Sequence, residues 1–189
     1  MQRASLTVAI AVLLWGCHST GESALPINLQ GEVSPSPFRC EGNQVHVVIF
    51  TTHDCPIANS YTPTLCRLFN SFASEARLQF FQVYLGSDLK SAQQHTHDYP
   101  HSEAVTLLDP RLQLARKWGA TRTPEAFVVG SDGIRYQGRI DDLYRDLGSR
   151  ANAPSRQDLH IAIEEVLGGH PVTQPRTQPV GCMIPWELP

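Results

Sequence analysis

Short apolar runs alternate with longer segments of helical period through most of the chain. The runs that predict strands are 45–50, 78–85, 105–108, 126–130 and 134–140. The segments that predict helices are 57–76, 91–98, 110–118 and 155–167. Strands that alternate with helices are typical of a sheet covered by helices, so the pattern predicts an α/β fold.

Local signals predict two of the connections. Ser131, Asp132 and Gly133 separate two β-rich runs, and glycine supplies the positive φ that a tight reversal needs. The last two strands are therefore predicted to be antiparallel. Asp109 followed by Pro110 predicts a helix start, with the aspartate as N-cap and the proline at the first helical position.

The first residues predict an export signal rather than part of the fold. An apolar segment, 4–14, follows Arg3 and is too short to span a bilayer as a stable helix. It leads into Leu-Trp-Gly before Cys17, which resembles a bacterial lipoprotein signal whose cysteine is lipidated and becomes the mature N-terminus. The alternative is a plain secretory signal in which Cys17 is incidental. Both make residues 1–16 a signal peptide for export, and lipidation adds a membrane anchor in the bacterial periplasm or outer cell envelope.

Composition and charge then narrow the class of protein. The 189 residues are 41% hydrophobic and 17% charged, which is ordinary for a globular protein with one core. The formal net charge is -3 and no basic run occurs, so binding to nucleic acid has no electrostatic support. The polar residues 17–39 predict a flexible tether, 40–170 the domain, and 171–189 a Pro-rich tail that lies across the domain surface.

Cys55 stands where the first predicted strand gives way to a helix. At a helix start its sulfur faces backbone N–H groups that have no partner in the helix, and this stabilises the thiolate over the thiol. Pro56 suits the first turn of the helix. We therefore predict a reactive thiol with a pKa below the ordinary value of about 8.5. The alternative is that Cys55 is a small buried apolar residue.

Three motifs in this order of elements carry a resemblance: Cys55-Pro56, Thr123-Pro124 and the Asp132-Gly133 hairpin. Together they resemble the thioredoxin fold, in the branch of bacterial exported redoxins related to thiol-disulfide oxidoreductases and peroxiredoxins. The resemblance covers about 40–170. It implies a three-layer sandwich with a mixed central sheet and flanking helices.

The resemblance also implies a site and its partners. Pro124 is expected to be cis and to lie across from Cys55, where the preceding backbone pairs with a bound substrate strand. The implied partners are protein thiols and disulfides or small peroxides, with an external thiol as reductant and no cofactor.

The chain departs from the pattern of both families. Thioredoxins have Cys-x-x-Cys, whereas this chain has Ala58 three residues after Cys55, so a local resolving thiol is missing. The peroxiredoxin pattern Pro-x-x-x-Thr-x-x-Cys is met at Thr52 and Cys55, but Val48 stands at the proline position. Arg122 is two residues from the place of the peroxiredoxin arginine. We therefore rank disulfide exchange by the single helix-start cysteine above peroxide reduction.

The partner of Cys55 must come from elsewhere in the chain. Cys66 is eleven residues away, about 16 Å along an intact helix, and a disulfide needs Cα atoms within about 7 Å. The helix returns Cys66 toward Cys40, which predicts a structural Cys40–Cys66 disulfide; the alternative is two unpaired buried thiols. The tail ends in Val-Gly-Cys-x-Ile, which resembles exported redoxins with Cys-Pro-Ile at the active site. That resemblance implies Cys182 as the resolving thiol, and an independent role is the alternative.

Histidines offer a different kind of site. His53 and Cys55 combine imidazole with thiolate, which suits copper or zinc. Copper-carrying relatives of the fold use Cys-x-x-x-Cys, and here Asn59 takes the second position. A metal site is therefore the alternative, not the prediction. The competing functions are a copper carrier at Cys55 and His53, or a redox-inert module that docks a partner through the Pro124 edge.

Two further polar groups are predicted to be solvated. His95 and His97 occur in a polar helical segment, which is typical of a surface face. Asp141 and Asp142 follow the hairpin in a segment typical of a charged surface turn. The alternative for the aspartates is a part in proton transfer.

Overall fold

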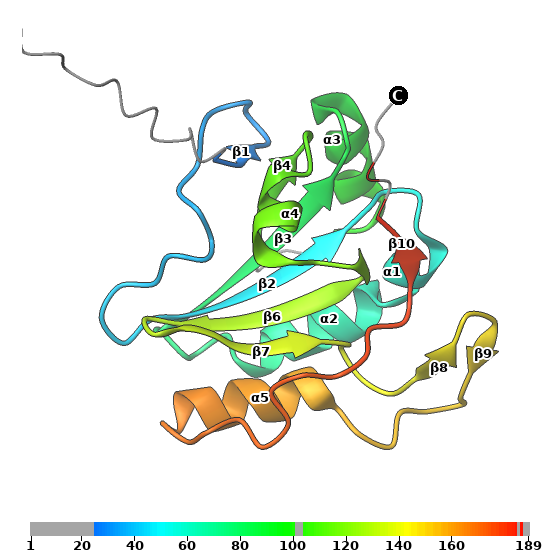
Figure 1. The fold of residues 1–189 in the computed structure, drawn as a ribbon. Helices are drawn as coiled ribbons and strands as arrows, with labels where there is room; N and C mark the ends of the chain where they lie inside the picture. Colours follow the sequence, from blue (N-terminus) through cyan, green and yellow to red (C-terminus); the bar gives the residue numbers. More distant parts are fainter. Residues whose placement is uncertain (1–24, 101–103, 185, 187–189) are drawn as a thin grey trace, which may run out of the picture.

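The computed structural model describes residues 25–100, 104–184 and 186. The signal segment and Cys17 lie outside these residues. A six-stranded sheet has the order β1-β4-β3-β2-β6-β7 (Figure 1). Its strands are β1 (Ile27–Asn28), β2 (Val45–Thr51), β3 (Leu78–Leu85), β4 (Ala104–Asp109), β6 (Glu125–Gly130) and β7 (Gly133–Gly138). Strands β2, β3 and β4 are parallel, whereas β1, β6 and β7 are antiparallel to their neighbours, so the sheet is mixed as predicted.

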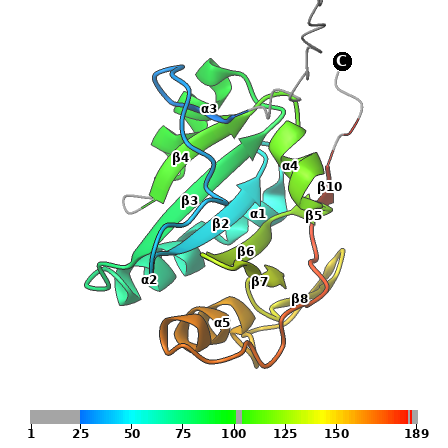
Figure 2. The ribbon, with the colours of Figure 1, turned by 60° about the vertical axis from the view of Figure 1, so that its left-hand side comes forward.

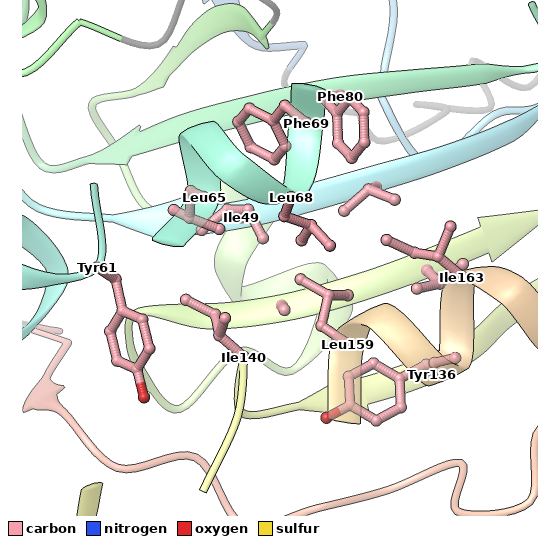
Figure 3. Close-up of a cluster of buried hydrophobic side chains, with 14 of the residues drawn as sticks. Ile49, Tyr61, Leu65, Leu68, Phe69, Phe80, Tyr136, Ile140, Leu159 and Ile163 are labelled. Carbon is pink, nitrogen blue, oxygen red and sulfur yellow. The ribbon is translucent and has the colours of Figure 1, made fainter. Parts of the chain in front are cut away.

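Helices cover both faces of the sheet. On one face lie α2 (Thr62–Ser71), α3 (Leu89–Asp98) and α5 (Asp158–Leu167), and on the other lies α4 (Gln113–Trp118). Figure 3 shows α2 and α5 packing on the sheet through the apolar side chains Leu65, Leu68, Phe69, Leu159 and Ile163. The predicted three-layer α/β sandwich is confirmed. In the described part of the chain, no helix is long and apolar enough to cross a bilayer.

The domain begins earlier than its sequence predicts. Ile27 pairs with Leu108 of β4, so residues 27 and 28 form an edge strand of the main sheet. Phe38 is buried on the α4 face, where its ring stacks on Trp118 with 4.2 Å between centroids. The predicted flexible tether over 17–39 is therefore wrong from residue 25 onward, because apolar residues in this polar segment pair with β4 or pack against the sheet.

Two local predictions have different outcomes. The hairpin between β6 and β7 is confirmed, with Gly130 opposite Gly133 and Gly133 at φ 112°. The helix start at Asp109 is wrong, because α4 begins at Gln113. The Asp109 carboxylate nevertheless accepts hydrogen bonds from the N–H groups of Gln113 (2.9 Å) and Ala115 (2.8 Å), so it caps the helix from a distance.

The long helix predicted over 57–76 is divided in two. The first part is α1 (Pro56–Ser60), and α2 follows after Tyr61. Pro63 stands in the first turn of α2, and it has no N–H to continue a hydrogen-bond ladder from α1. The division leaves α1 as a short turn that carries Cys55 at its start.

The tail runs along the edge of β7 before it reaches the site (Figure 2). The Gln137 N–H donates to Pro175 O (2.9 Å), and the Thr177 N–H donates to Gln137 O (3.1 Å). Beyond them, β10 (Cys182–Met183) pairs antiparallel with β5 (Arg122–Thr123). A separate hairpin, β8 (Tyr144–Asp146) and β9 (Ser149–Arg150), precedes α5.

Candidate active site

Cys55 caps the N-terminus of α1. Its backbone is extended (φ −84°, ψ 109°), and its Sγ accepts a hydrogen bond from the Ala58 N–H at 3.4 Å. Pro56 occupies the first turn, where a missing N–H leaves no partner unsatisfied. The structure therefore places the sulfur at a helix start, as predicted, but the side chain is only 1% exposed.

The Thr123–Pro124 peptide bond is cis and lies directly beside Cys55. The Cys55 thiol donates to Thr123 O at 3.1 Å, so the carbonyl before the proline contacts the sulfur. The hydroxyls of Thr52 and Thr123 hydrogen-bond to each other at 3.3 Å in the buried interior. Thr52 thus connects the loop before Cys55 to the cis-proline loop.

Cys182 joins this site from the far end of the chain. In the pairing of β10 with β5, Cys182 lies opposite Thr123. Burial and a hydrogen bond with the Cys55 thiol raise the pKa of Cys182 to about 12, and the nearby Asp54 carboxylate acts in the same direction. The structure therefore brings Cys55 and Cys182 into contact, although 127 positions of sequence separate residue 55 from residue 182.

Close backbone contact and apolar burial hold β10 in place. A Cβ on Gly181 would lie 2.0 Å from Thr123 O, so only glycine fits against β5 here. Ile184 is buried in the core beneath α4. The Arg116 guanidinium lies 5.0 Å from the centre of the Trp186 ring and donates to Trp186 O at 2.5 Å.

A buried carboxylate supports the cis-proline loop. Glu125 is 1% exposed, and its Oε2 accepts from the N–H groups of Thr121 (2.6 Å) and Arg122 (3.1 Å). Its Oε1 accepts from Gln137 Nε2 (2.8 Å), and Gln137 in turn accepts from Arg176 of the tail (2.6 Å). Sequence reasoning missed Glu125, although an acidic residue that opens an apolar strand is a detectable signal.

The predicted Cys40–Cys66 disulfide is wrong, because the two thiols, both free, lie on opposite faces of the sheet. The Cys40 thiol packs on the α4 face and donates to Val129 O at 3.3 Å. The Cys66 thiol, on α2 and therefore on the opposite face, donates to Pro100 O at 3.4 Å. The sheet separates the two cysteines, and the sequence pattern did not reveal that Cys40 belongs to the α4 side.

The histidines near α1 belong to a polar network. His53 Nδ1 lies 3.0 Å from Ser87 Oγ. His95 is buried, not solvated as predicted, with Nδ1 2.8 Å from the Tyr84 hydroxyl and Nε2 2.9 Å from Asn59 Oδ1. His53 and Cys55 thus engage different partners, and the described residues contain no group of three or more side chains placed to hold a metal.

Asp141 also departs from its prediction. It is buried rather than solvated, and it accepts from the Tyr61 hydroxyl (2.6 Å) and the Leu143 N–H (2.9 Å). Tyr61 is the residue at which α1 and α2 divide, so this contact ties the start of α2 to the loop after β7. Asp142 accepts hydrogen bonds from the Ser155 hydroxyl, the Arg156 N–H (2.9 Å) and the Ser155 N–H (2.7 Å), and these bonds, that of the hydroxyl above all, lower its pKa to about 2.

Comparisons with known proteins agree with this geometry. The family model described as thioredoxin-like matches residues 42–134. No curated protein matches the chain in sequence. An uncharacterized conserved protein from Geobacillus kaustophilus is 23% identical, with a TM-score of 0.69 over 88% of this chain and 92% of that one.

Two further solved structures share the fold. A hypothetical protein of Sinorhizobium meliloti 1021 is 20% identical, with a TM-score of 0.72 over 87% of this chain and 91% of that one. A secreted disulfide oxidoreductase of Mycobacterium tuberculosis is 15% identical, with a TM-score of 0.52 over 78% and 96% of the two chains. The matched family model, the mixed sheet and the cis-proline beside a helix-start cysteine together lead to one conclusion: residues 42–134 are thioredoxin-like, and the chain has the thioredoxin-like α/β fold.

Proposed function

We propose that this protein is an exported thiol-disulfide oxidoreductase whose redox couple is Cys55 and Cys182. The observation that carries the proposal is that both cysteines meet at Thr123: the Cys55 thiol donates to Thr123 O at 3.1 Å, and Cys182 pairs with Thr123 in the β10–β5 ladder. A disulfide between them needs little movement of a strand that is already paired beside the helix start. The disulfide oxidoreductase from M. tuberculosis, described as secreted, is consistent with both the chemistry and the export.

The two sulfurs have different roles in this couple. The Ala58 N–H donates to Cys55 Sγ at the helix start, and we assign to Cys55 the attack that closes the internal disulfide. Cys182 has a raised pKa and remains a thiol at neutral pH. Each cycle exchanges two electrons and two protons with a partner that carries a dithiol or a disulfide.

Peroxide reduction at Cys55 ranks below disulfide exchange. Peroxide has to reach the thiolate, and Cys55 is only 1% exposed. Arg122 lies on β5 opposite Met183, and within the described residues the partners of the Cys55 sulfur are Thr123, Ala58 and Cys182 rather than an arginine.

The proposal is tested on the purified protein as it is exported, after removal of the predicted signal peptide. After oxidation, non-reducing peptide mass spectrometry should show a Cys55–Cys182 disulfide, and the protein should oxidise a model peptide that contains two cysteines. Cys55→Ser and Cys182→Ser should each lose this turnover, whereas Cys66→Ser should keep it. Turnover that survives in Cys182→Ser would contradict the couple, and tight copper(I) binding without exchange would favour the carrier alternative.

A further inference from the structure

The two cysteines of the proposed couple differ in their access to solvent. Cys55 is 1% exposed, because its sulfur is enclosed by Thr123, Cys182 and α1. Cys182 is partly exposed, and the next residue, Met183, is 74% exposed. A molecule that approaches from solvent therefore meets the sulfur of Cys182 before that of Cys55.

The strand that covers Cys55 is held on both sides of Cys182. On one side, the backbone of Gly181 lies so close to Thr123 O that any side chain would displace it. On the other side, Ile184 is 3% exposed in the core under α4, and Trp186 lies against Arg116. These contacts stabilise β10 on β5 in the reduced protein, and a disulfide to Cys55 adds a covalent link.

A partner strand has no room at this edge of β5 while β10 is seated. The family resemblance implies that a substrate strand pairs with the backbone before Pro124, but that backbone is paired with Cys182 and Met183 of the same chain. A partner therefore either displaces the tail or reacts at the sulfur that the tail presents. The buried contacts of Gly181 and Ile184 favour the second route.

We propose that thiol partners exchange with the oxidised protein at Cys182, with β10 still seated, and that Cys55 is the sulfur that leaves. This inference rests on the proposed Cys55–Cys182 couple. The partner that fits is a thiol, free or on an exposed protein segment, that approaches from solvent and pairs with no strand of the sheet.

The exchange balances in two steps. The partner thiolate forms a bond to Cys182 Sγ, the bond between Cys182 and Cys55 breaks, and its electron pair goes to Cys55, where the Ala58 N–H stabilises the charge. A second partner thiolate then attacks the partner sulfur and releases Cys182, which takes up a proton. The two partner thiols lose two electrons and two protons as they form a disulfide, and the protein disulfide takes up both to become two thiols.

The acid–base properties of Cys182 agree with this order. Burial and the neighbouring Cys55 raise its pKa to about 12, so the released sulfur is protonated at neutral pH. A protonated thiol is a poor nucleophile, since the thiolate is the reactive form. Cys182 therefore does not readily attack the disulfide that it has just released.

The test locates the first bond on the full-length oxidised protein. Cys40 and Cys66 are first alkylated, glutathione is added, and the reaction is quenched with acid early in the first turnover. Peptide mass spectrometry should find about tenfold more glutathione on Cys182 than on Cys55, since the accessible sulfur is attacked first. Equal or greater labelling of Cys55 would overturn this inference and leave the couple intact. Absence of a Cys55–Cys182 disulfide in the starting protein would overturn the proposed function as well.

A second measurement tests whether β10 protects Cys55. Gly181→Ala adds a Cβ that must move β10 away from Thr123 O. We expect the share of glutathione on Cys55 to rise at least about fivefold, because the buried sulfur becomes accessible. Gln178→Ala, an exposed change in the same tail, should keep the original ratio. An unchanged ratio in Gly181→Ala would overturn the inference.

Discussion

Thr52 connects the loop before Cys55 to the cis-proline loop, and the two loops must keep their relative positions for Cys55 to contact Thr123. Its hydroxyl bonds to the Thr123 hydroxyl at 3.3 Å, and both residues are buried. Thr52→Val keeps the shape and removes the bond, so Thr123 loses a partner. We expect a loss of about 1 kcal/mol in the free energy of unfolding, measured in urea. Thr106→Val, on a partly exposed strand position, is the control and should change stability by less than about 0.5 kcal/mol.

The lowered pKa of His95 predicts how the stability of the protein responds to pH. Burial lowers its pKa from the ordinary value of 6.5, and His53 acts in the same direction, while Asp98 opposes both. The folded protein therefore binds fewer protons at His95 than the unfolded chain does. Its contribution to stability is complete above pH 6.5 and is lost as the pH falls toward and through the folded value.

The measurement compares the free energies of unfolding in urea of the His95→Gln variant and of the original protein, from pH 7.5 down to pH 5. Besides His53 and Asp98, the groups that contact the His95 ring are Tyr84, Asn59 and Tyr99. The original protein should lose more stability across the interval than the variant does. Parallel pH profiles would show that His95 is not the group responsible.

At the scale of elements, β5 and the cis-proline loop depend on one carboxylate. Glu125 accepts from two backbone N–H groups, the Thr121 hydroxyl and the Gln137 amide. Glu125→Ala leaves these buried donors without an acceptor, so we expect a loss of about 3 kcal/mol in the free energy of unfolding. The rate at which the Cys55–Cys182 disulfide forms should fall as well, because the loop presents Thr123 to both cysteines.

Two variants separate this role from a general loss of charge. Glu125→Gln retains one acceptor oxygen and should recover part of the stability. Glu164→Ala removes an exposed carboxylate from α5 and should change stability by less than about 0.5 kcal/mol. A Glu125→Ala protein as stable as the Glu164→Ala protein would contradict a supporting role for the buried carboxylate.

For the whole molecule, the lipid anchor proposed at Cys17 would hold the protein, and with it the active site, at a membrane. In a bacterial host, the full-length protein should be recovered in the detergent phase of a phase-separation assay, because diacylation adds apolar surface. Cys17→Ala should move the protein to the aqueous phase. If both proteins are found in the aqueous phase, the segment is a plain secretory signal.

The order of the longer strands and helices and the place of Cys55 could be predicted from the sequence. Strand periodicity, the Asp132-Gly133 turn and the position of Cys55 before a proline are local properties, so a single stretch of sequence carries each of them. The α/β class followed from them, whereas the mixed three-layer sandwich and the cis conformation at Pro124 were expected from the family resemblance. Both are confirmed.

Which distant residues come into contact could not be predicted in this way, because the packing of the sheet and helices sets those contacts. Cys40 and Cys66 lie on opposite faces of the sheet, while His95 and Asp141 are buried through contacts with Tyr84 and Tyr61. The seating of the tail on β5 likewise depends on a backbone contact at Gly181 and on burial of Ile184. Such contacts join residues far apart in the chain, and no periodicity in the sequence encodes them. They exist because the sheet and its helices bring these surfaces together.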